Sequence, residues 1–291
     1  TIYELYYRWR ADGSGWGTAN DGENFYPLKT TSATATVWPA EPQAPKVLLV
    51  VVESWGAPSS AREYEEQVKS LATHPRLRVL DQGNVDYSGG TVAGELRELC
   101  QIVPISYAFA KVPQKFSDHC LPQLLGTKGY RTIALHAAHS GMYARDEWYP
   151  TIGFQQSYFL NKPLVHVGRC HGFPGYCDVE LIPAIADTLI HNDKVFFYWM
   201  TLNSHVPYEP GDLKERHVGK CVQLGLADGE RCNQFLLIKE LFDSIAKKLG
   251  IEQLSGLEIL MVGDHKPAFF RANYDDDFVK DRVPYLHLQV K

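Results

Sequence analysis

The sequence contains no hydrophobic run long enough to cross a bilayer. Its longest purely aliphatic stretch is residues 47–52, whereas a transmembrane helix needs about 20 residues. It has no tract rich in Lys and Arg, and its formal net charge is −5, so no nucleic-acid partner is expected. No CxxC pair occurs, which argues against a zinc ribbon. What remains is a globular composition, 45% hydrophobic over 291 residues, which suits one large α/β domain or two smaller ones.

The six cysteines predict an oxidising compartment. Proximity in the sequence favours the pairs Cys100–Cys120, Cys170–Cys177 and Cys221–Cys232, although six thiols allow many other pairings. Such bridges persist in the periplasm or outside the cell rather than in the cytosol. Six buried free thiols in a cytosolic enzyme remain the alternative on this pattern alone.

Residues 1–45 predict a juxtamembrane or linker segment, followed by a catalytic domain over residues 46–291. The opening TIYELYYRWR is rich in Tyr, Trp and Arg, which suit a membrane–water interface. We therefore expect a membrane anchor to precede this chain, with an ordinary N-terminal segment packed on the domain as the alternative. The stretch TTSATATVWPAEPQAP is small, polar and Pro-rich, and predicts a linker laid over the surface.

From residue 46 onwards, predicted strands alternate with predicted helices. Residues 46–54 form a β-branched apolar run typical of a strand buried on both faces. Ser59 or Ser60 could cap the helix that follows. Strands are expected at 77–83, 131–137, 194–203, 257–265 and 283–290, and helices at 59–74, 89–100, 120–130, 178–191 and 234–250. This order predicts an α/β fold with a mainly parallel central sheet and helices on both faces.

Polar side chains follow several of these strands. In parallel sheets, ligands bind beyond the carboxyl ends of the strands, so residues there are candidates for chemistry. The strand ends deliver Glu53 and Ser54; His136 and His139; Asn203, Ser204 and His205; and Asp264 and His265. Thr91 begins a helix after two glycines.

Glu53, Asp264 and His265 offer two oxygens and one nitrogen to a divalent cation. Three protein ligands with an open position are typical of a catalytic metal site, and the mixed donor set suits Zn²⁺ or Mn²⁺. Taken singly, Glu53 could cap the next helix, and Asp264 with His265 could form a turn. A metal would activate the otherwise weak Thr91 hydroxyl as a nucleophile; the alternative is that Thr91 only caps its helix.

Four segments, VVVESWG, SGGTVAGELRELC, TLNSHVPY and VGDHKPAF, resemble the alkaline phosphatase/sulfatase-like superfamily in order and rough spacing. The resemblance covers about residues 46–290. It is closest to the extracytoplasmic branch of lipoteichoic acid synthases, phosphoglycerol transferases and phosphoethanolamine transferases.

The resemblance implies roles for particular residues. One divalent metal, Zn²⁺ or Mn²⁺, would be bound by Glu53, Thr91, Asp264 and His265. Thr91 would also be the nucleophile that carries a phospho-intermediate. His205 would hold phosphate oxygens or protonate the leaving group. The donor head group would contact His136, Tyr143 and Arg145, and His139 is a further candidate for substrate binding.

The implied reaction moves phosphoglycerol or phosphoethanolamine from a phospholipid donor to an envelope glycan, in two steps through Thr91. It would take place at the extracytoplasmic face of the bacterial inner membrane. Val92, Lys266 and Pro267 depart from the pattern of many relatives, which leaves the head group open. Two rivals remain: a phosphodiesterase or sulfatase-type hydrolase on the same site, and a non-catalytic glycan- or lipid-binding domain. No C/S-x-P-x-R segment, typical of sulfatases, lies near Thr91.

Overall fold

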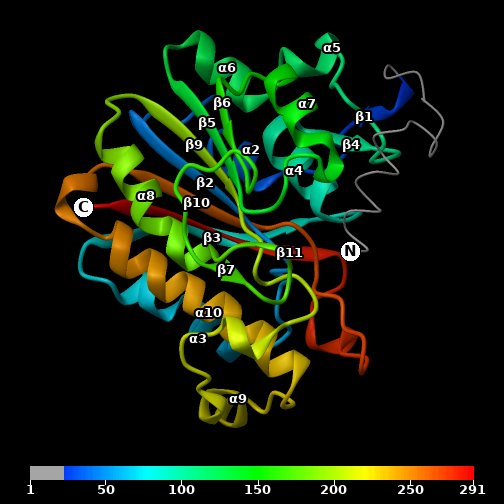
Figure 1. The fold of residues 1–291 in the computed structure, drawn as a ribbon, viewed down its shortest axis with the longest axis vertical. Coiled ribbons are helices and arrows are strands. Elements are labelled where there is room, and N and C mark those ends of the chain that lie inside the picture. Colours follow the sequence, from blue (N-terminus) through cyan, green and yellow to red (C-terminus); the bar gives the residue numbers. More distant parts are fainter. Residues whose placement is uncertain (1–22) are drawn as a thin grey trace.

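The computed structural model describes residues 23–291 as a central sheet between two layers of helices (Figure 1). The sheet has seven strands in the order β3-β11-β10-β2-β9-β5-β6. In that order the strands span Leu77–Asp86, Arg282–Val290, Glu258–Gly263, Lys46–Val52, Val195–Met200, Arg131–His136 and Gln156–Tyr158. Neighbours from β10 to β6 pair in parallel, whereas β11 is antiparallel to both β10 and β3. The predicted mainly parallel sheet is confirmed.

The central strand β2 explains why helices cover both faces. Its side chains alternate between two apolar cores: Leu48, Val50 and Val52 face one, and Val47, Leu49 and Val51 face the other. Because no face of this strand meets water, it carries an unbroken apolar run. The first core is covered by α3 (Ala61–Thr73), α8 (Asp178–Ile190) and α10 (Glu230–Leu249). The second is covered by α4 (Thr91–Cys100), α6 (Leu121–Thr127) and α7 (Arg145–Thr151).

The remaining elements are short. Two small antiparallel pairs join β1 (Phe25–Pro27) to β4 (Ile102–Pro104), and β7 (Arg169–Cys170) to β8 (Gly175–Tyr176). The short helices are α2 (Ala33–Val37), α5 (Gln114–Ser117) and α9 (Val218–Leu224). Of the two serines considered as a cap for α3, it is Ser60 whose side chain accepts from the backbone N–H of Glu63.

The segment ahead of β2 contains structure that its composition did not predict. Within the expected linker, Ser32 caps the short helix α2, and Ala33 and Trp38 are buried against the domain. The expected membrane-interface stretch TIYELYYRWR lies outside the described residues. The domain boundary at residue 45 stays a prediction.

All three predicted disulfides are present. They join Cys100 to Cys120, Cys170 to Cys177 and Cys221 to Cys232. No free cysteine remains among residues 23–291, so the alternative of six free thiols is wrong. Over the same residues, none of the helices has the length and apolarity that a membrane span requires.

Candidate metal centre and active site

Strands β2 and β10 end side by side and bring two carboxylates and one imidazole together. Strands β2 and β10 pair in parallel register up to Val52 and Gly263. The next residues along each chain, Glu53 and Asp264, therefore emerge at the same edge of the sheet. His265 follows directly, although more than two hundred residues separate it from Glu53 in the sequence.

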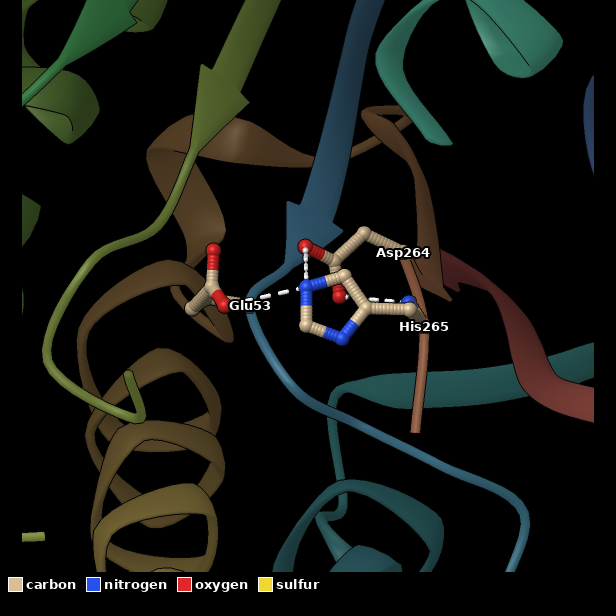
Figure 2. A group of neighbouring side chains, drawn as sticks. All are labelled: Glu53, Asp264 and His265. Atoms are coloured by element: carbon tan, nitrogen blue, oxygen red, sulfur yellow. Dashed lines mark hydrogen bonds and ion pairs between the residues drawn. The ribbon is translucent and has the colours of Figure 1, made fainter. Parts of the chain in front are cut away.

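Glu53, Asp264 and His265 form the group of His, Asp and Glu side chains in the described chain that could hold a metal ion (Figure 2). One donor atom from each lies within 4.8 Å of the other two. His265 Nε2 is 3.4 Å from Glu53 Oε1 and 3.3 Å from Asp264 Oδ2. Glu53 and Asp264 are buried, and the His265 side chain is 18% exposed. The predicted set of three thus lies together at a site that retains some access to solvent.

Hydrogen bonds orient these side chains toward a common centre. Asp264 Oδ1 accepts from the backbone N–H groups of Ser54 at 2.8 Å and His265 at 2.6 Å. Asp264 Oδ2 is buried and has no hydrogen-bond partner among the described residues. His265 Nδ1 lies 2.7 Å from the Lys266 carbonyl, so in the tautomer with hydrogen on Nδ1, Nε2 presents its lone pair to the carboxylates. An unpartnered buried oxygen beside a second carboxylate and an imidazole fits a divalent cation.

The pKa values show how strongly these groups interact. Burial and the charge of Glu53 raise the pKa of Asp264 to about 8. Burial opposes the charged form of His265, but the charges of Asp264 and Glu53 outweigh this and raise its pKa to about 10. Burial likewise opposes ionisation of Glu53, yet its hydrogen bond and charge interaction with His265 hold its pKa well below the ordinary value. The site concentrates negative charge that a proton or a metal ion neutralises.

Thr91 is the first residue of α4, and its hydroxyl reaches the same cluster. Thr91 Oγ1 is 3.2 Å from Glu53 Oε2 and 3.4 Å from His265 Nε2. The N-cap of α4 is Gly90, and no side-chain bond caps the helix within the described structure. The interpretation of Thr91 as only an N-cap is therefore wrong. Tyr107 lies behind this turn, and its hydroxyl accepts from the Gly90 N–H at 2.7 Å.

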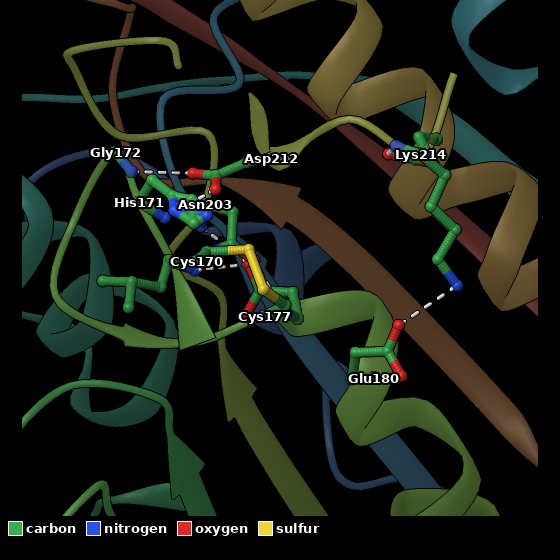
Figure 3. Close-up of a disulfide and its surroundings, with 11 residues drawn as sticks. Cys170, His171, Gly172, Cys177, Glu180, Asn203, Asp212 and Lys214 are labelled. Atoms are coloured by element: carbon green, nitrogen blue, oxygen red, sulfur yellow. Dashed lines mark hydrogen bonds and ion pairs between the residues drawn. A yellow bond between two sulfur atoms is a disulfide. The ribbon is translucent and has the colours of Figure 1, made fainter. Parts of the chain in front are cut away.

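His205 follows β9 and packs against a separate loop that is closed by a disulfide. Its ring centroid is 4.5 Å from that of Phe173, and its charge contributes to the lowered pKa of Glu53. The Cys170–Cys177 bridge closes the loop that carries Phe173, and Asp212 accepts hydrogen bonds from two backbone N–H groups of that loop (Figure 3). The loop thus supplies an aromatic surface against the predicted substrate-side histidine.

His136 ends β5 as a buried neutral imidazole. Its Nδ1 lies 3.0 Å from the Met200 carbonyl. Burial and the charge of Arg145 lower its pKa to about 3. Its Nε2 is buried without a hydrogen-bond partner among residues 23–291. With hydrogen on Nδ1, Nε2 is an acceptor for a hydroxyl or ammonium donor.

The segment after His136 differs from a simple head-group clamp. Arg145 is fully buried, and its guanidinium donates to Glu95 through Nε at 3.0 Å and Nη2 at 2.7 Å. Tyr143 has a positive φ of 55° and packs edge-on against Tyr107 at 5.9 Å. His139 Nδ1 accepts from the Gly141 N–H at 3.1 Å. Contact of these three side chains with a substrate stays a prediction, and Arg145 already has a carboxylate partner in the protein.

Three further residues shape the site: Ser54 is among the predicted strand-end residues, whereas Gly94 and Arg97 were not singled out from the sequence. Ser54 donates to Glu53 Oε1 at 2.9 Å. Gly94 lets α4 approach the backbone of Asp264. Arg97 donates to the carbonyls of Gly263 and Asp264. The available signal was a group of three charged residues, Glu95, Arg97 and Glu98, inside a helix whose other residues are mostly apolar.

Comparison with known proteins gives one family match. The family model described as Sulfatase matches residues 45–277. That span covers most of the chain. A comparison with curated proteins found no match.

Solved structures with the same fold include three bacterial proteins. The lipoteichoic acid synthase LtaP from Listeria monocytogenes has a TM-score of 0.60 and 19% identity over 83% of this chain, which spans only 64% of that protein. The C-terminal periplasmic domain of EcEptC from Escherichia coli, in complex with Zn, has a TM-score of 0.58 and 15% identity, covering 91% of this chain and 77% of that one. The phosphoglycerol transferase GacH from Streptococcus pyogenes, in complex with sn-glycerol-1-phosphate, has a TM-score of 0.51 and 16% identity, covering 83% and 67%. At these identities the likeness establishes the fold.

Proposed function

The chain belongs to the sulfatase family, and on that premise we propose that it is a metal-dependent transferase of a phospho-head group. The donor is a phospholipid, the acceptor is an envelope glycan, and the transferred group is phosphoglycerol or phosphoethanolamine. The observation that carries the proposal is the Thr91 hydroxyl at the start of α4, 3.2 Å from Glu53 and 3.4 Å from His265. The three disulfides support an extracytoplasmic location.

Glu53, Asp264 and His265 would hold one divalent cation, Zn²⁺ or Mn²⁺, with Thr91 beside it. When bound, such an ion lowers the pKa of a neighbouring hydroxyl and stabilises charge on phosphoryl oxygens. The chain itself supplies the uncapped N-terminus of α4, whose backbone N–H groups and helix dipole favour an anion at the position of Thr91. A phosphate placed there meets the nucleophile directly.

The proposed reaction has two displacements. In the first, Thr91 Oγ loses its proton and forms a bond to phosphorus, the bond from phosphorus to the diacylglycerol oxygen breaks, and that oxygen takes a proton. In the second, an acceptor hydroxyl loses its proton and forms the new bond to phosphorus, and Thr91 Oγ leaves, regaining a proton. His205 is the candidate that delivers and removes these protons, with its ring held by Phe173. His136 Nε2 would accept a hydrogen bond from the head group.

Intact-mass measurement after incubation with a donor lipid tests this proposal. The protein is loaded with Zn²⁺ or Mn²⁺ and mixed separately with phosphatidylglycerol and phosphatidylethanolamine in detergent micelles. A covalent adduct is expected with one donor, and its mass identifies the head group. Thr91→Ala should abolish the adduct, and Thr91→Ser should retain it because the hydroxyl remains.

Ser54→Ala is the matched control, since the Ser54 hydroxyl also donates to the Glu53 carboxylate. It should still form the adduct. An adduct that survives Thr91→Ala, or that depends on Ser54, refutes the assignment of the nucleophile. An adduct that decays to free head-group phosphate at the same rate with or without added glycan indicates a hydrolase. No adduct and no head-group release with either lipid supports a binding domain.

A further inference from the structure

Arg97 is a buried cation that contacts the backbone of the metal-ligand turn rather than its ligand atoms. It is 2% exposed. Its Nη1 donates to the carbonyl of Asp264 at 3.0 Å, and its Nη2 donates to the carbonyl of Gly263 at 2.6 Å. These two carbonyls lie where β10 ends and the ligands begin. Charge-assisted hydrogen bonds of this kind are stronger than neutral ones, so the guanidinium fixes the path of the chain into Asp264.

The same helix carries the proposed nucleophile. Thr91 begins α4, and Arg97 lies six residues later, which places it about 9 Å further along the helix axis. Between them, Gly94 brings the helix so close to Asp264 that an added Cβ would lie 2.7 Å from the Asp264 Cβ. Helix α4 therefore fixes the position of Thr91 relative to the backbone of Asp264.

The charge of Arg97 is balanced by the carboxylate of Glu98. That carboxylate also contacts residues that precede the span 45–277 matched by the family model. Arg97 Nε donates to Glu98 Oε1 at 2.7 Å. Glu98 Oε2 accepts from the backbone N–H of Thr34 at 2.9 Å, and Oε1 lies 3.4 Å from the N–H of Ala33. The Thr34 hydroxyl in turn donates to the Glu98 carbonyl at 2.8 Å. Ala33 and Thr34 belong to α2, ahead of the residues 45–277 that match the family.

We propose that Arg97 is a positioning residue for the metal centre, and that α2 supports it through Glu98. The chain of contacts runs from the N–H groups of α2 to the Glu98 carboxylate, to the Arg97 guanidinium, and to the carbonyls of the ligand turn. By fixing that turn, Arg97 keeps Asp264 Oδ2 directed at Glu53 and His265. The α2 segment, which precedes the family-matched span, then helps to hold the metal site and is more than a linker. This inference rests on the metal site of the proposed function.

The test measures metal binding in the folded protein without any substrate. Arg97→Met removes the guanidinium, and Arg97→Lys keeps the charge but replaces the planar fork with a compact ammonium that does not match the same three acceptors. Zn²⁺ affinity is obtained by chelator competition, and the visible absorption spectrum of the Co²⁺-substituted protein reports the coordination geometry. Loss of groups that orient metal ligands typically lowers affinity about 10- to 100-fold. We expect that loss for Arg97→Met, a smaller loss for Arg97→Lys and for Glu98→Gln, and an altered Co²⁺ spectrum in each.

Arg231→Met is the matched control. Arg231 is also fully buried and paired, but its donors go to Glu63 at 2.6 Å, Asp277 at 2.7 Å and Gln234 at 3.2 Å rather than to the carbonyls of the ligand turn. It should lower the melting temperature while leaving Zn²⁺ affinity within about twofold of the parent, because none of its hydrogen bonds within the described structure goes to a metal ligand or to the carbonyls that Arg97 holds.

Two results would overturn the proposal. One is a folded Arg97→Lys or Arg97→Met protein with the Zn²⁺ affinity and Co²⁺ spectrum of the parent. The other is an equal loss of affinity in Arg231→Met, which would assign the effect to general destabilisation. The variant Glu53→Gln distinguishes failure of the Arg97 proposal from failure of the proposed function. If Glu53→Gln binds Zn²⁺ as tightly as the parent, the metal site itself is wrong. If it loses Zn²⁺ while the Arg97 variants keep it, only the role of Arg97 fails.

Discussion

Gly94→Ala separates helix propensity from packing at the metal site. An added Cβ would lie 2.7 Å from the Asp264 Cβ, 2.8 Å from its Cα and 3.1 Å from its carbonyl oxygen. Ordinary contacts begin near 3.4 Å, so α4 and the ligand turn must move apart by about 0.7 Å. The Asp264 backbone resists this movement because its carbonyl is held by Arg97 and its carboxylate by the Ser54 N–H.

The two contributions have opposite signs. Alanine in a helix interior is favoured over glycine by about 1 kcal/mol. Overpacking against fixed neighbours costs about 1–3 kcal/mol. We expect the free energy of unfolding of Gly94→Ala to fall by about 1 kcal/mol. Because Thr91 moves with α4, the rate of adduct formation should fall about tenfold or more, as a misplacement approaching 1 Å can do.

Urea denaturation and the adduct assay measure these effects, and Gly126→Ala is the control. Gly126 also lies in a helix, α6, but its added Cβ would have no heavy atom closer than 3.9 Å. That variant should gain about 0.5–1 kcal/mol from helix propensity and keep the adduct rate. The reasoning is refuted if Gly94→Ala is stabilised as much as Gly126→Ala and forms the adduct at the parent rate.

Three further predictions concern groups around the site. Burial raises the pKa of Asp178 to about 7 from 3.8; the folded state therefore retains a proton that the unfolded state releases. Urea denaturation should show the free energy of unfolding falling from pH 4 to pH 7 by up to about 1.4 kcal/mol per pH unit. The variant Asp178→Asn should lose this part of the pH dependence. An unchanged pH profile of stability in the variant contradicts the assignment. Replacing both Cys100 and Cys120 by serine should lower stability by about 3 kcal/mol in the same assay; a loss below about 1 kcal/mol would mean the bridge contributes little. Phe173→Ala should slow adduct formation in the mass assay by removing the ring that packs on His205, without changing Zn²⁺ affinity; an unchanged rate would remove Phe173 from this role.

Much of the architecture was readable from local pattern. The unbroken apolar run of β2, the regular alternation with helices, and the polar residues at the strand ends each report burial or propensity over a few neighbours. The cysteine pairs could be inferred because each partner is the next cysteine along the chain. The gathering of Glu53, Asp264 and His265 followed from a general property of parallel sheets, whose carboxyl ends share one edge.

Packing produced what the pattern could not predict. The composition of residues 30–45 predicts a linker, yet Ala33 and Thr34 of α2 are buried, and their N–H groups meet Glu98 on α4. Arg145, whose contact with a head group stays a prediction, donates to Glu95, fifty residues earlier in the chain, and the pattern did not predict that partner.

By itself, the sequence determined the main strands and helices from residue 46 onwards, the residues that stand at the strand ends, and the favoured cysteine pairs. All of these depend on neighbours within a few positions or on the shared edge of a parallel sheet. Only the tertiary structure decided the partner of each buried charge: Arg97 with the ligand turn, and Arg145 with Glu95. A buried guanidinium must find acceptors wherever the fold places them, and those acceptors depend on the order of the strands and the approach of the helices rather than on spacing along the chain.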